Sequence, residues 1–241
     1  SPEKEDFFLP YKSKGQNRFQ FHALDLNKQL DAIVSVIKEF QPDYIVNFSA
    51  QGMVAQSWEN PEQWFQTNGM ALMSLANRLK QENYLKRFVQ ISTPEVYGSC
   101  SGYIKEDAPL NPSTPYAASK ASGDLSLTPF QKYHNFPVVF TRATNVYGAH
   151  QQLYRIIPRT VIYIKQNKKI QLQGGGKAVK SYIHIRDVCA ATLQIARNGK
   201  NGETYHISPD GEGISIVNLV SLICTKMGRS LDDCVTMADE R

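Results

Sequence analysis

Short apolar runs alternate with longer amphipathic stretches along most of this chain. The apolar runs at residues 43–49, 87–93 and 137–142 have the length and composition of buried strands. Residues 61–81 and 114–134, which lie between them, carry a helical pattern, and Pro61 suits the first turn of the first stretch. Because alternation of strands and helices favours a parallel sheet with crossover helices, we predict an α/β fold with a doubly wound parallel sheet.

Weaker patterns extend this prediction to both ends of the chain. Strands are predicted at residues 19–24, 170–173, 181–185 and 203–207, and helices at 27–40, 153–166, 187–197 and 215–227, with a kink at Pro129. A chain of 241 residues can form one sizeable α/β domain and a small lobe. We therefore predict a core over residues 1–150 and a mixed segment over 151–241 that contributes to a second lobe and to the last strands.

The composition is ordinary for a soluble globular protein, with 41% apolar residues, 20% charged residues and a net charge of +5. The basic residues are dispersed and form no nucleic-acid-binding motif, so no nucleic-acid partner is expected. No apolar run reaches the length of a membrane span and no signal peptide opens the chain, so no membrane partner is expected. The four cysteines form no CxxC pair and the five histidines have no metal-ligand spacing. This pattern predicts neither a metal site nor a disulfide framework, and it fits a cytoplasmic location.

Two segments carry the residue types of a proton-transfer site. ISTPEVYG at residues 91–98 ends an apolar run with Ser92 and Thr93, and PYAASKASGDL at 115–125 places Tyr116 four residues before Lys120. On a helix this spacing puts the two side chains on one face, one turn apart. A lysine ammonium beside a phenol favours the phenolate and lowers the tyrosine pKa from about 10 toward neutrality. Tyr116 can then exchange a proton with a sugar or alcohol hydroxyl, to which Thr93 can also bond.

These segments resemble the extended short-chain dehydrogenase/reductase family, in particular its nucleotide-sugar dehydratases and epimerases, and most of all the dTDP-glucose 4,6-dehydratase group. The resemblance continues through NFSAQGMVAQSWENP (47–61), TRATNVYG (141–148) and GGGKAVKSYIHIRDV (174–188), and so covers nearly the whole chain. It implies a Rossmann-like sheet, NAD as the cofactor and a nucleotide-diphosphate sugar as the substrate. It also implies a homodimer formed through the helices over 61–81 and 114–134, although a plain core explains the same apolar residues.

The resemblance implies roles for four residues of the two segments. It implies that Tyr116 is the acid/base group and that Lys120 is its electrostatic partner and bonds the nicotinamide ribose. Thr93 would bond the 4-oxygen of the sugar, and Ser92 would lie close to the nicotinamide. The ordinary alternatives are an exposed lysine on a helix face and a β-branched residue at the end of a strand.

Glu95 best discriminates between reactions. In the dehydratases a carboxylate here removes the C5 proton after oxidation at C4, which permits elimination of the 6-hydroxyl. The dTDP-glucose enzymes read Thr-Asp-Glu, whereas this chain reads Thr93-Pro94-Glu95. Proline has no proton to give, so Glu95 would serve as both base and acid. GDP-mannose dehydratases read Thr-Ser-Glu and UDP-glucuronate decarboxylases Ser-Thr-Ser-Glu, so an epimerase or a decarboxylase stays an alternative to a dehydratase.

Further cofactor contacts follow from the resemblance. It implies that Asp25 and Leu26 lie against the adenine, although Asp25 also suits the capping region of the next helix. Ser49, Ala50 and Gln51 follow a predicted buried strand, where family members pass the cofactor phosphate and ribose.

Four more residues match family positions outside the two proton-transfer segments at 91–98 and 115–125. Asn68 lies in a predicted helix, where the family has an asparagine that braces the central strands. Asn145 matches an asparagine that bonds the substrate diphosphate. Arg155 and Lys180 are candidates for phosphate or nucleotide contacts, and ordinary solvated cations are the alternative. Where this chain has Lys180 the family more often has arginine, whose fork is bidentate.

A dinucleotide-binding domain opens with a strand, a Gly-rich turn and a helix whose N-terminus holds the pyrophosphate, and this sequence shows no such element. The glycines at 174–176 lie far downstream and precede a predicted strand. The first clear strand resembles the family's third. We therefore expect an internal portion of a longer polypeptide that lacks the first β-α-β unit. The alternative is a non-catalytic, dimerising scaffold without the cofactor turn.

Overall fold

The computed structural model of the chain describes residues 19–100 and 102–238. Contacts within the chain divide it into two compact units. Unit 1 extends to Arg142 and also includes Thr192–Tyr205, and unit 2 consists of Ala143–Ala191 and the residues from His206 onward. The chain thus leaves unit 1 after its third strand and returns to it half-way along a later helix. The predicted domains over residues 1–150 and 151–241 stay a prediction.

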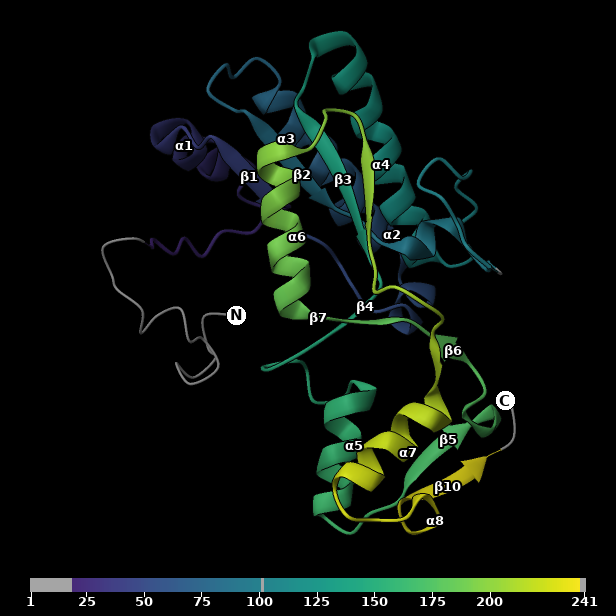
Figure 1. Cartoon of the computed structure of the whole chain (residues 1–241). Coiled ribbons are helices and arrows are strands. Elements are labelled where there is room, and N and C mark those ends of the chain that lie inside the picture. Colours follow the sequence, from purple (N-terminus) through teal and green to yellow (C-terminus); the bar gives the residue numbers. More distant parts are fainter. Residues whose placement is uncertain (1–18, 101, 239–241) are drawn as a thin grey trace. The chain divides into compact units, whose positions relative to one another are not determined.

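A four-stranded sheet forms the centre of unit 1. Its strands are β1 (Tyr44–Asn47), β2 (Arg87–Ile91), β3 (Val138–Ala143) and β8 (Thr204–Ile207), in the order β1-β2-β3-β8 (Figure 1). β1 pairs with β2 and β2 with β3 in parallel, so that Val89 lies between Val46 and Val139. The prediction of an α/β protein with a parallel sheet is confirmed.

Helices cover both faces of this sheet, as Figure 1 shows. On one face, Phe88 and Val138 share a core with α1 (Leu30–Phe40), α3 (Leu72–Leu79) and α4 (Pro115–His134). Their neighbours Val89 and Val139 belong to the core of the other face, together with Ala196 of α6 (Ile185–Asn198). Side chains of a strand alternate between faces, so a sheet covered on both sides needs apolar residues at consecutive positions.

The helix predicted over residues 61–81 is divided in the structure. It consists of α2 (Pro61–Phe65), a π-helical turn (Gln66–Ala71) and α3. α4 approaches this turn so closely that a Cβ added to Gly123 would lie 2.3 Å from the backbone oxygen of Asn68. Glycine is therefore required at position 123 by the approach of two backbones.

Other sequence predictions differ from the structure toward the N-terminus and at Pro129. Residues 19–24 form no strand, because none of the described sheets offers them a partner for their backbone hydrogen bonds. α1 begins at Leu30 instead of residue 27, and α4 is continuous through Pro129. The remaining elements are present, with ends that differ from the predicted ones by a few residues at most.

Unit 2 contains three two-stranded sheets within the described residues. β4 (Asn145–Tyr147) pairs with β7 (Tyr182–His184) and β5 (Ile170–Gln173) with β10 (Val235–Ala238), both in parallel, and β6 (Val179–Lys180) is antiparallel to β9 (Ile214–Ser215). The helices that belong entirely to this unit are α5 (Ile156–Lys165), α7 (Ile216–Lys226) and α8 (Leu231–Cys234). Their core includes Ile164, Ile170 and Val220 together with Cys224 and Cys234.

Cys224 and Cys234, ten residues apart in sequence, lie together in this core as free thiols. Burial, reinforced by a hydrogen bond with the Cys234 thiol, raises the pKa of Cys224 from 9.0 to about 11.

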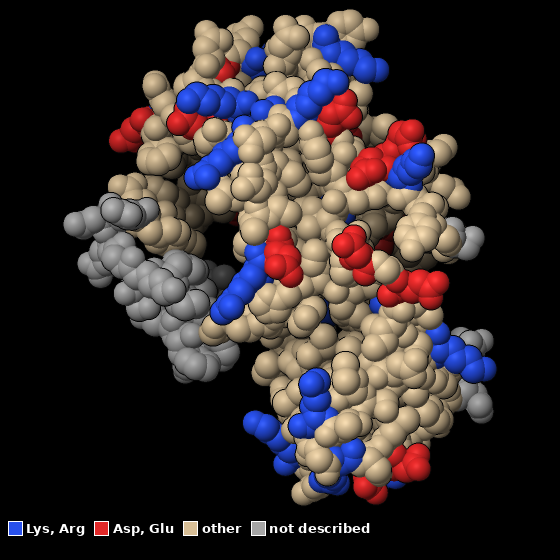
Figure 2. Space-filling model, in the orientation of Figure 1, with Lys and Arg blue, Asp and Glu red and all other residues tan. Residues whose placement is uncertain are grey.

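Among the residues that the structure describes, no group of three His, Cys, Asp or Glu side chains is placed to hold a metal ion. None of the helices in the same residues combines the length and the apolar character that a membrane span requires. Figure 2 shows acidic and basic side chains interspersed over the visible face of the molecule.

Candidate active site

The candidate site begins where β2 ends. Ser92 and Thr93 follow the strand and are both buried. Thr93 has an extended backbone and caps the short 3-10 turn Pro94–Tyr97, since its Oγ1 accepts a hydrogen bond from the backbone nitrogen of Glu95 at 3.3 Å. Pro94 suits the first position of this turn. Glu95 is exposed, so its carboxylate is accessible from solvent.

The first turn of α4 presents the second part of the site. Thr114 caps α4 through the backbone nitrogen of Ala117, and Tyr116 is half-buried in the first turn. The backbone nitrogen of Tyr116 donates to the hydroxyl of Ser57 at 3.1 Å, and its carbonyl accepts from Ser119 at 2.7 Å. The position of the tyrosine is therefore set by backbone bonds on both sides.

Lys120 is 3% exposed, although lysine is almost never fully buried without a partner. Its Nζ donates to the carbonyl oxygen of Ile91, the last residue of β2, at 2.7 Å. Burial lowers the pKa of Lys120, and the charge of Asp124, one helical turn further on, opposes this shift. The structure thus joins Lys120 directly to the strand end that carries Ser92 and Thr93. A solvated lysine, the ordinary alternative, is excluded by its burial.

A buried polar network adjoins this strand end, and the sequence interpretation missed it. The Ser92 hydroxyl donates to Oδ2 of Asp124 at 2.6 Å, and the same oxygen accepts from the guanidinium of Arg142 at 3.1 Å. Arg142 also donates to the hydroxyl of Tyr97, over whose ring the guanidinium lies at 4.8 Å. Asp124 follows Lys120 by four residues, so the helical spacing that joined Tyr116 to Lys120 could have been extended to it.

The loop after β1 contains the three predicted cofactor contacts at residues 49–51. Ser49 and Ala50 are exposed, and Gln51 is half-buried. The side chain of Asn68 accepts from the Gln51 nitrogen at 2.8 Å and donates to the Gln51 carbonyl at 3.0 Å. Asn68 also donates to Ser119 of α4 at 2.8 Å. Asn68 therefore braces this loop against the helix that carries Tyr116.

Asp25 and Leu26 lie in a turn before α1. The carboxylate of Asp25 accepts from the backbone nitrogen of Asn27 at 2.8 Å, and its carbonyl accepts from Lys28 and Gln29. Gln29 is at the N-cap position of α1 but makes no side-chain cap, and the hydrogen bonds of Asp25 lie in the turn that leads into this helix, so both interpretations of Asp25 stay predictions. Asp25 is exposed, whereas Leu26 packs against the core of unit 1.

The three substrate candidates Asn145, Arg155 and Lys180 all lie in unit 2. Each is exposed. The amide of Asn145 donates to the Ser181 carbonyl at 3.1 Å, and the guanidinium of Arg155 lies 5.5 Å from the ring centre of Tyr154. The structure does not bring these three residues to a common hydrogen-bonded group.

A cavity of about 280 Å³ within unit 2 is lined by Arg159, Gln171 and Gln173 beside apolar and glycine neighbours. None of the three predicted substrate residues lines it. The sequence interpretation did not single out Arg159. One cation and two amides lie around this cavity.

The fold and the site together define a class. A Rossmann-like parallel sheet whose strand end carries Ser-Thr, beside a Tyr-x-x-x-Lys helix, is the arrangement of a nucleotide-sugar epimerase or dehydratase of the short-chain dehydrogenase/reductase class. The family model described as GDP-mannose 4,6 dehydratase matches residues 8–241, and the chain belongs to this family.

Individual relatives agree with this assignment. The chain is 36% identical over 178 residues to a dTDP-glucose 4,6-dehydratase of Streptomyces niveus, a match that covers 73% of this chain and 52% of the relative. It is 35% identical over 178 residues to the low-salt glycan biosynthesis protein Agl12 of Haloferax volcanii, covering 73% of this chain and 56% of that protein. The chain therefore spans little more than half the length of these curated relatives.

Solved structures resemble the chain over most of its length. The dTDP-glucose 4,6-dehydratase DesIV of Streptomyces venezuelae, crystallised with NAD bound, has a TM-score of 0.86 at 28% identity and covers 97% of this chain and 70% of its own. A UDP-glucuronic acid 4-epimerase of Bacillus cereus, in complex with UDP-glucuronic acid and NAD, has a TM-score of 0.85 at 25% identity. The match covers 95% of this chain and 72% of the epimerase.

Proposed function

We propose that this chain carries the catalytic residues of an NAD-dependent nucleotide-sugar 4,6-dehydratase, which converts a nucleotide-diphosphate hexose to its 4-keto-6-deoxy derivative. One observation carries the proposal: buried Lys120 joins the Tyr116 helix to the strand end that bears Ser92, Thr93 and Glu95. The dehydratases among the relatives support the reaction type.

Proton transfer at the 4-hydroxyl of the sugar is assigned to Tyr116. The Lys120 ammonium favours the phenolate of Tyr116, which takes the hydroxyl proton. The Thr93 hydroxyl bonds the same oxygen. Because backbone bonds hold Tyr116 and the Thr93 hydroxyl caps the adjacent turn, both groups are placed before substrate arrives.

Elimination is assigned to Glu95. Once C4 is a ketone, the C5 proton is acidic and the Glu95 carboxylate removes it. The 6-hydroxyl leaves with a proton as water, which gives an alkene conjugated to the ketone. Because Pro94 has no proton to give, the protonated Glu95 returns the proton that it took from C5 to the leaving hydroxyl.

Several residues fit NAD. Lys120, Tyr116 and Ser92 would hold the nicotinamide ribose end, Ser49, Ala50 and Gln51 the phosphate and ribose, and Asp25 with Leu26 the adenine. The braced loop at Gln51 and the exposed carboxylate of Asp25 suit these roles. When bound, NAD would supply the acceptor for the C4 hydride and the donor of the hydride to C6. The enolate left by hydride addition takes one proton at C5, which balances the proton that Tyr116 took from the 4-hydroxyl. Within residues 19–100 and 102–238, however, no Gly-rich turn joins a strand to a helix N-terminus; the glycines Gly174–Gly176 stand between β5 and β6.

Substrate contacts from unit 2 are assigned to Asn145, Arg155 and Lys180. Arg159 is added to them because it lines the cavity.

A homodimer is proposed through α2, α3 and α4 and the turn between α2 and α3. Phe65, Met70 and Leu125 support it, since these apolar side chains of the packed helices are 39%, 52% and 60% exposed. The free thiols fit our proposal that the enzyme acts in the cytoplasm.

A C4 epimerase is the second candidate, because the Bacillus cereus epimerase has the same fold and Pro94 removes the second acid of the dTDP-glucose enzymes. An epimerase shares the oxidation at C4 but needs no base at C5.

A product assay decides among these functions. The full-length protein is incubated with NAD and dTDP-glucose, GDP-mannose or UDP-glucuronate, and the products are analysed by mass spectrometry. We expect loss of one water from one of the hexose nucleotides. An epimer of unchanged mass contradicts the dehydratase, and loss of carbon dioxide from UDP-glucuronate indicates the decarboxylase. Absence of any product, together with absence of NAD binding by calorimetry, would support the scaffold.

A further inference from the structure

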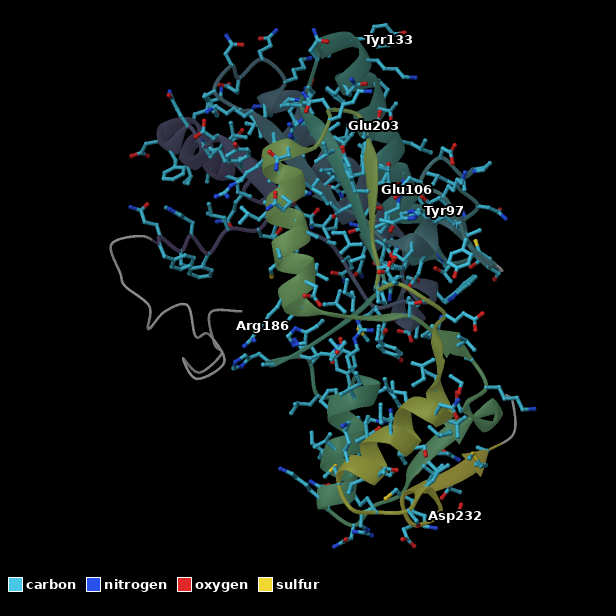
Figure 3. All side chains as sticks on the ribbon, viewed as in Figure 1. Tyr97, Glu106, Tyr133, Arg186, Glu203 and Asp232 are labelled. Atoms are coloured by element: carbon cyan, nitrogen blue, oxygen red, sulfur yellow. The ribbon has the colours of Figure 1, made fainter. Side chains whose placement is uncertain are left out.

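The polar network beside the strand end links four elements of unit 1. Ser92 follows β2, Tyr97 ends the turn that begins at Pro94, Asp124 lies in α4, and Arg142 is in β3. The side chains of Asp124 and Arg142 are 4% and 5% exposed. The Tyr97 hydroxyl, which accepts from Arg142, donates to the carbonyl of Glu106 at 3.1 Å, and Figure 3 shows these two labelled residues close together.

The hydrogen bonds of Asp124 favour its ionised form. Its Oδ2 accepts from both Ser92 and Arg142, as a carboxylate oxygen does. Its Oδ1 has no hydrogen-bond partner among the described residues, so a proton placed there would find no acceptor. Arginine stays protonated in proteins, so a neutral Asp124 would leave a buried guanidinium without a counter-charge. Burial raises the pKa of Asp124, and the Ser92 hydroxyl, Arg142 and Lys120 oppose that shift. We take Asp124 to be ionised at neutral pH.

Lys120 has an unusual setting for a group that must carry charge. Its ammonium is buried and its one described hydrogen bond is to an uncharged carbonyl, that of Ile91. Around Lys120 and Asp124, Ser92 after β2 and Arg142 of β3 act on Asp124, Tyr97 of the turn bonds Arg142, and Tyr116 precedes Lys120 by one turn of α4. The carboxylate of Asp124 is the charge that favours the Lys120 ammonium.

We propose that Asp124 is a positioning residue for catalysis: its carboxylate, held in place by Arg142, keeps Lys120 charged beside Tyr116 and orients the Ser92 hydroxyl at the end of β2. This role rests on the proposed acid/base function of Tyr116. Tyr116, Lys120 and Asp124 follow one another at intervals of four residues along one face of α4, so the charges alternate along the helix. The Asp124 carboxylate stabilises the Lys120 ammonium, and this ammonium stabilises the Tyr116 phenolate.

This role can be distinguished from a purely structural one, because it predicts that the pH at which Lys120 loses its proton depends on the Asp124 charge. Without the Asp124 charge, burial alone acts on Lys120, and its ammonium loses the proton at lower pH. The pair then shifts from phenolate and ammonium to phenol and amine, which lowers the supply of base. Binding of the sugar nucleotide changes little, because Asp124 is enclosed by protein groups.

The test measures Lys120 directly in the full-length protein. The protein is prepared with isotopically labelled lysine, and the Lys120 signal is assigned by its loss in Lys120→Met and followed by NMR across pH. We expect Asp124→Asn to lower the midpoint of Lys120 by about one pH unit or more. The charge-conserving Asp124→Glu should keep it near the wild-type value. The alkaline limb of kcat should move to lower pH in the Asn variant alone, with KM nearly unchanged.

Two further variants keep the test decisive. Tyr97→Phe removes a bond to Arg142 but no charge near Lys120, so it should lower stability and leave the midpoint in place. If Asp124→Asn does not fold, the neutral pair Asp124→Asn with Arg142→Gln avoids an unpaired buried guanidinium, and the same measurement applies. A folded Asn variant with a wild-type Lys120 midpoint overturns the proposal. A shifted midpoint in a protein that forms no product from any sugar nucleotide would instead reject the proposed function and leave the electrostatic role of Asp124 intact.

Discussion

The interiors of the two units differ in the number of polar and charged side chains that they bury. Unit 1 buries polar and charged side chains around its strand ends, among them Asn47, Gln90, Lys120, Asp124 and Arg142. Among the described residues, the core of unit 2 around α5 and α7 buries no charged side chain, and its polar members are Thr160 and two uncharged thiols. Burying an ion pair contributes little net stability, because desolvation offsets the attraction. The polar interior therefore indicates selection for the position and charge of particular groups, and the apolar one indicates selection for stability.

If the two interiors have these different purposes, substitutions in them should affect different measurements. In unit 1 a small change at the site should remove activity and leave the fold. In unit 2 a small change in the core should remove stability and leave the chemistry of each folded molecule.

The largest expected effect is on activity in unit 1. Tyr116→Phe removes one hydroxyl and keeps the ring, so kcat should fall by about 10²–10⁴-fold, as is usual for loss of an acid/base group. The unfolding midpoint should stay close to that of the wild type. Tyr163→Phe, in the core of unit 2, is the matched control and should keep its activity. A Tyr116→Phe enzyme within a few-fold of wild-type kcat would remove this tyrosine from the mechanism.

The next effect is on stability in unit 2. Ile170 is 1% exposed in the core, so Ile170→Ala should lower the free energy of unfolding by about 2–5 kcal/mol, and Ile170→Val by about 0.5–1.5 kcal/mol. Denaturant unfolding measures both, and the difference between them reports the packing around one side chain. If Ile170→Ala leaves stability unchanged and abolishes turnover of the folded enzyme, the contrast between the units is wrong.

The smallest effect concerns pH. The pKa of Cys224 rises from 9.0 to about 11 in the folded chain, so the folded state holds this thiol proton more tightly than the unfolded state. Its contribution to stability is full below about pH 9 and is lost as the pH rises toward 11. Unfolding measured across this range should show a decline that Cys224→Ala reduces. An equal decline in wild type and variant would show that other groups cause it.

The difference between the units also explains what the sequence could predict. Apolar runs and helical spacing identified the sheet, the helices and the core of unit 2, because burial of apolar side chains leaves a periodic pattern. The Ser-Thr, Tyr and Lys residues were found as a local motif, and in the structure the Lys120 ammonium bonds the last carbonyl of β2. The roles of the individual site residues stay predictions.

Contacts between segments that are far apart in the sequence leave no periodic pattern by which they could be predicted. Arg142 reads as one polar residue in a strand until the fold brings it to Asp124, and Arg159 reads as a solvated cation until a cavity forms beside it. The predicted strand at residues 19–24 shows the converse, since a local pattern yields no strand where the described sheets supply no partner.

Glu95 provides the most direct test of the proposed dehydratase. Glu95→Gln keeps the size of the side chain and cannot accept the C5 proton, and Pro94 offers no substitute within the triplet. In the full-length enzyme with NAD and its hexose nucleotide, we expect the absorbance of the reduced cofactor to accumulate while no 4-keto-6-deoxy sugar forms. Normal formation of that product by the Gln variant would contradict the role of Glu95. Conversion of the hexose nucleotide by the wild-type enzyme to a C4 epimer without loss of water would contradict the dehydratase itself.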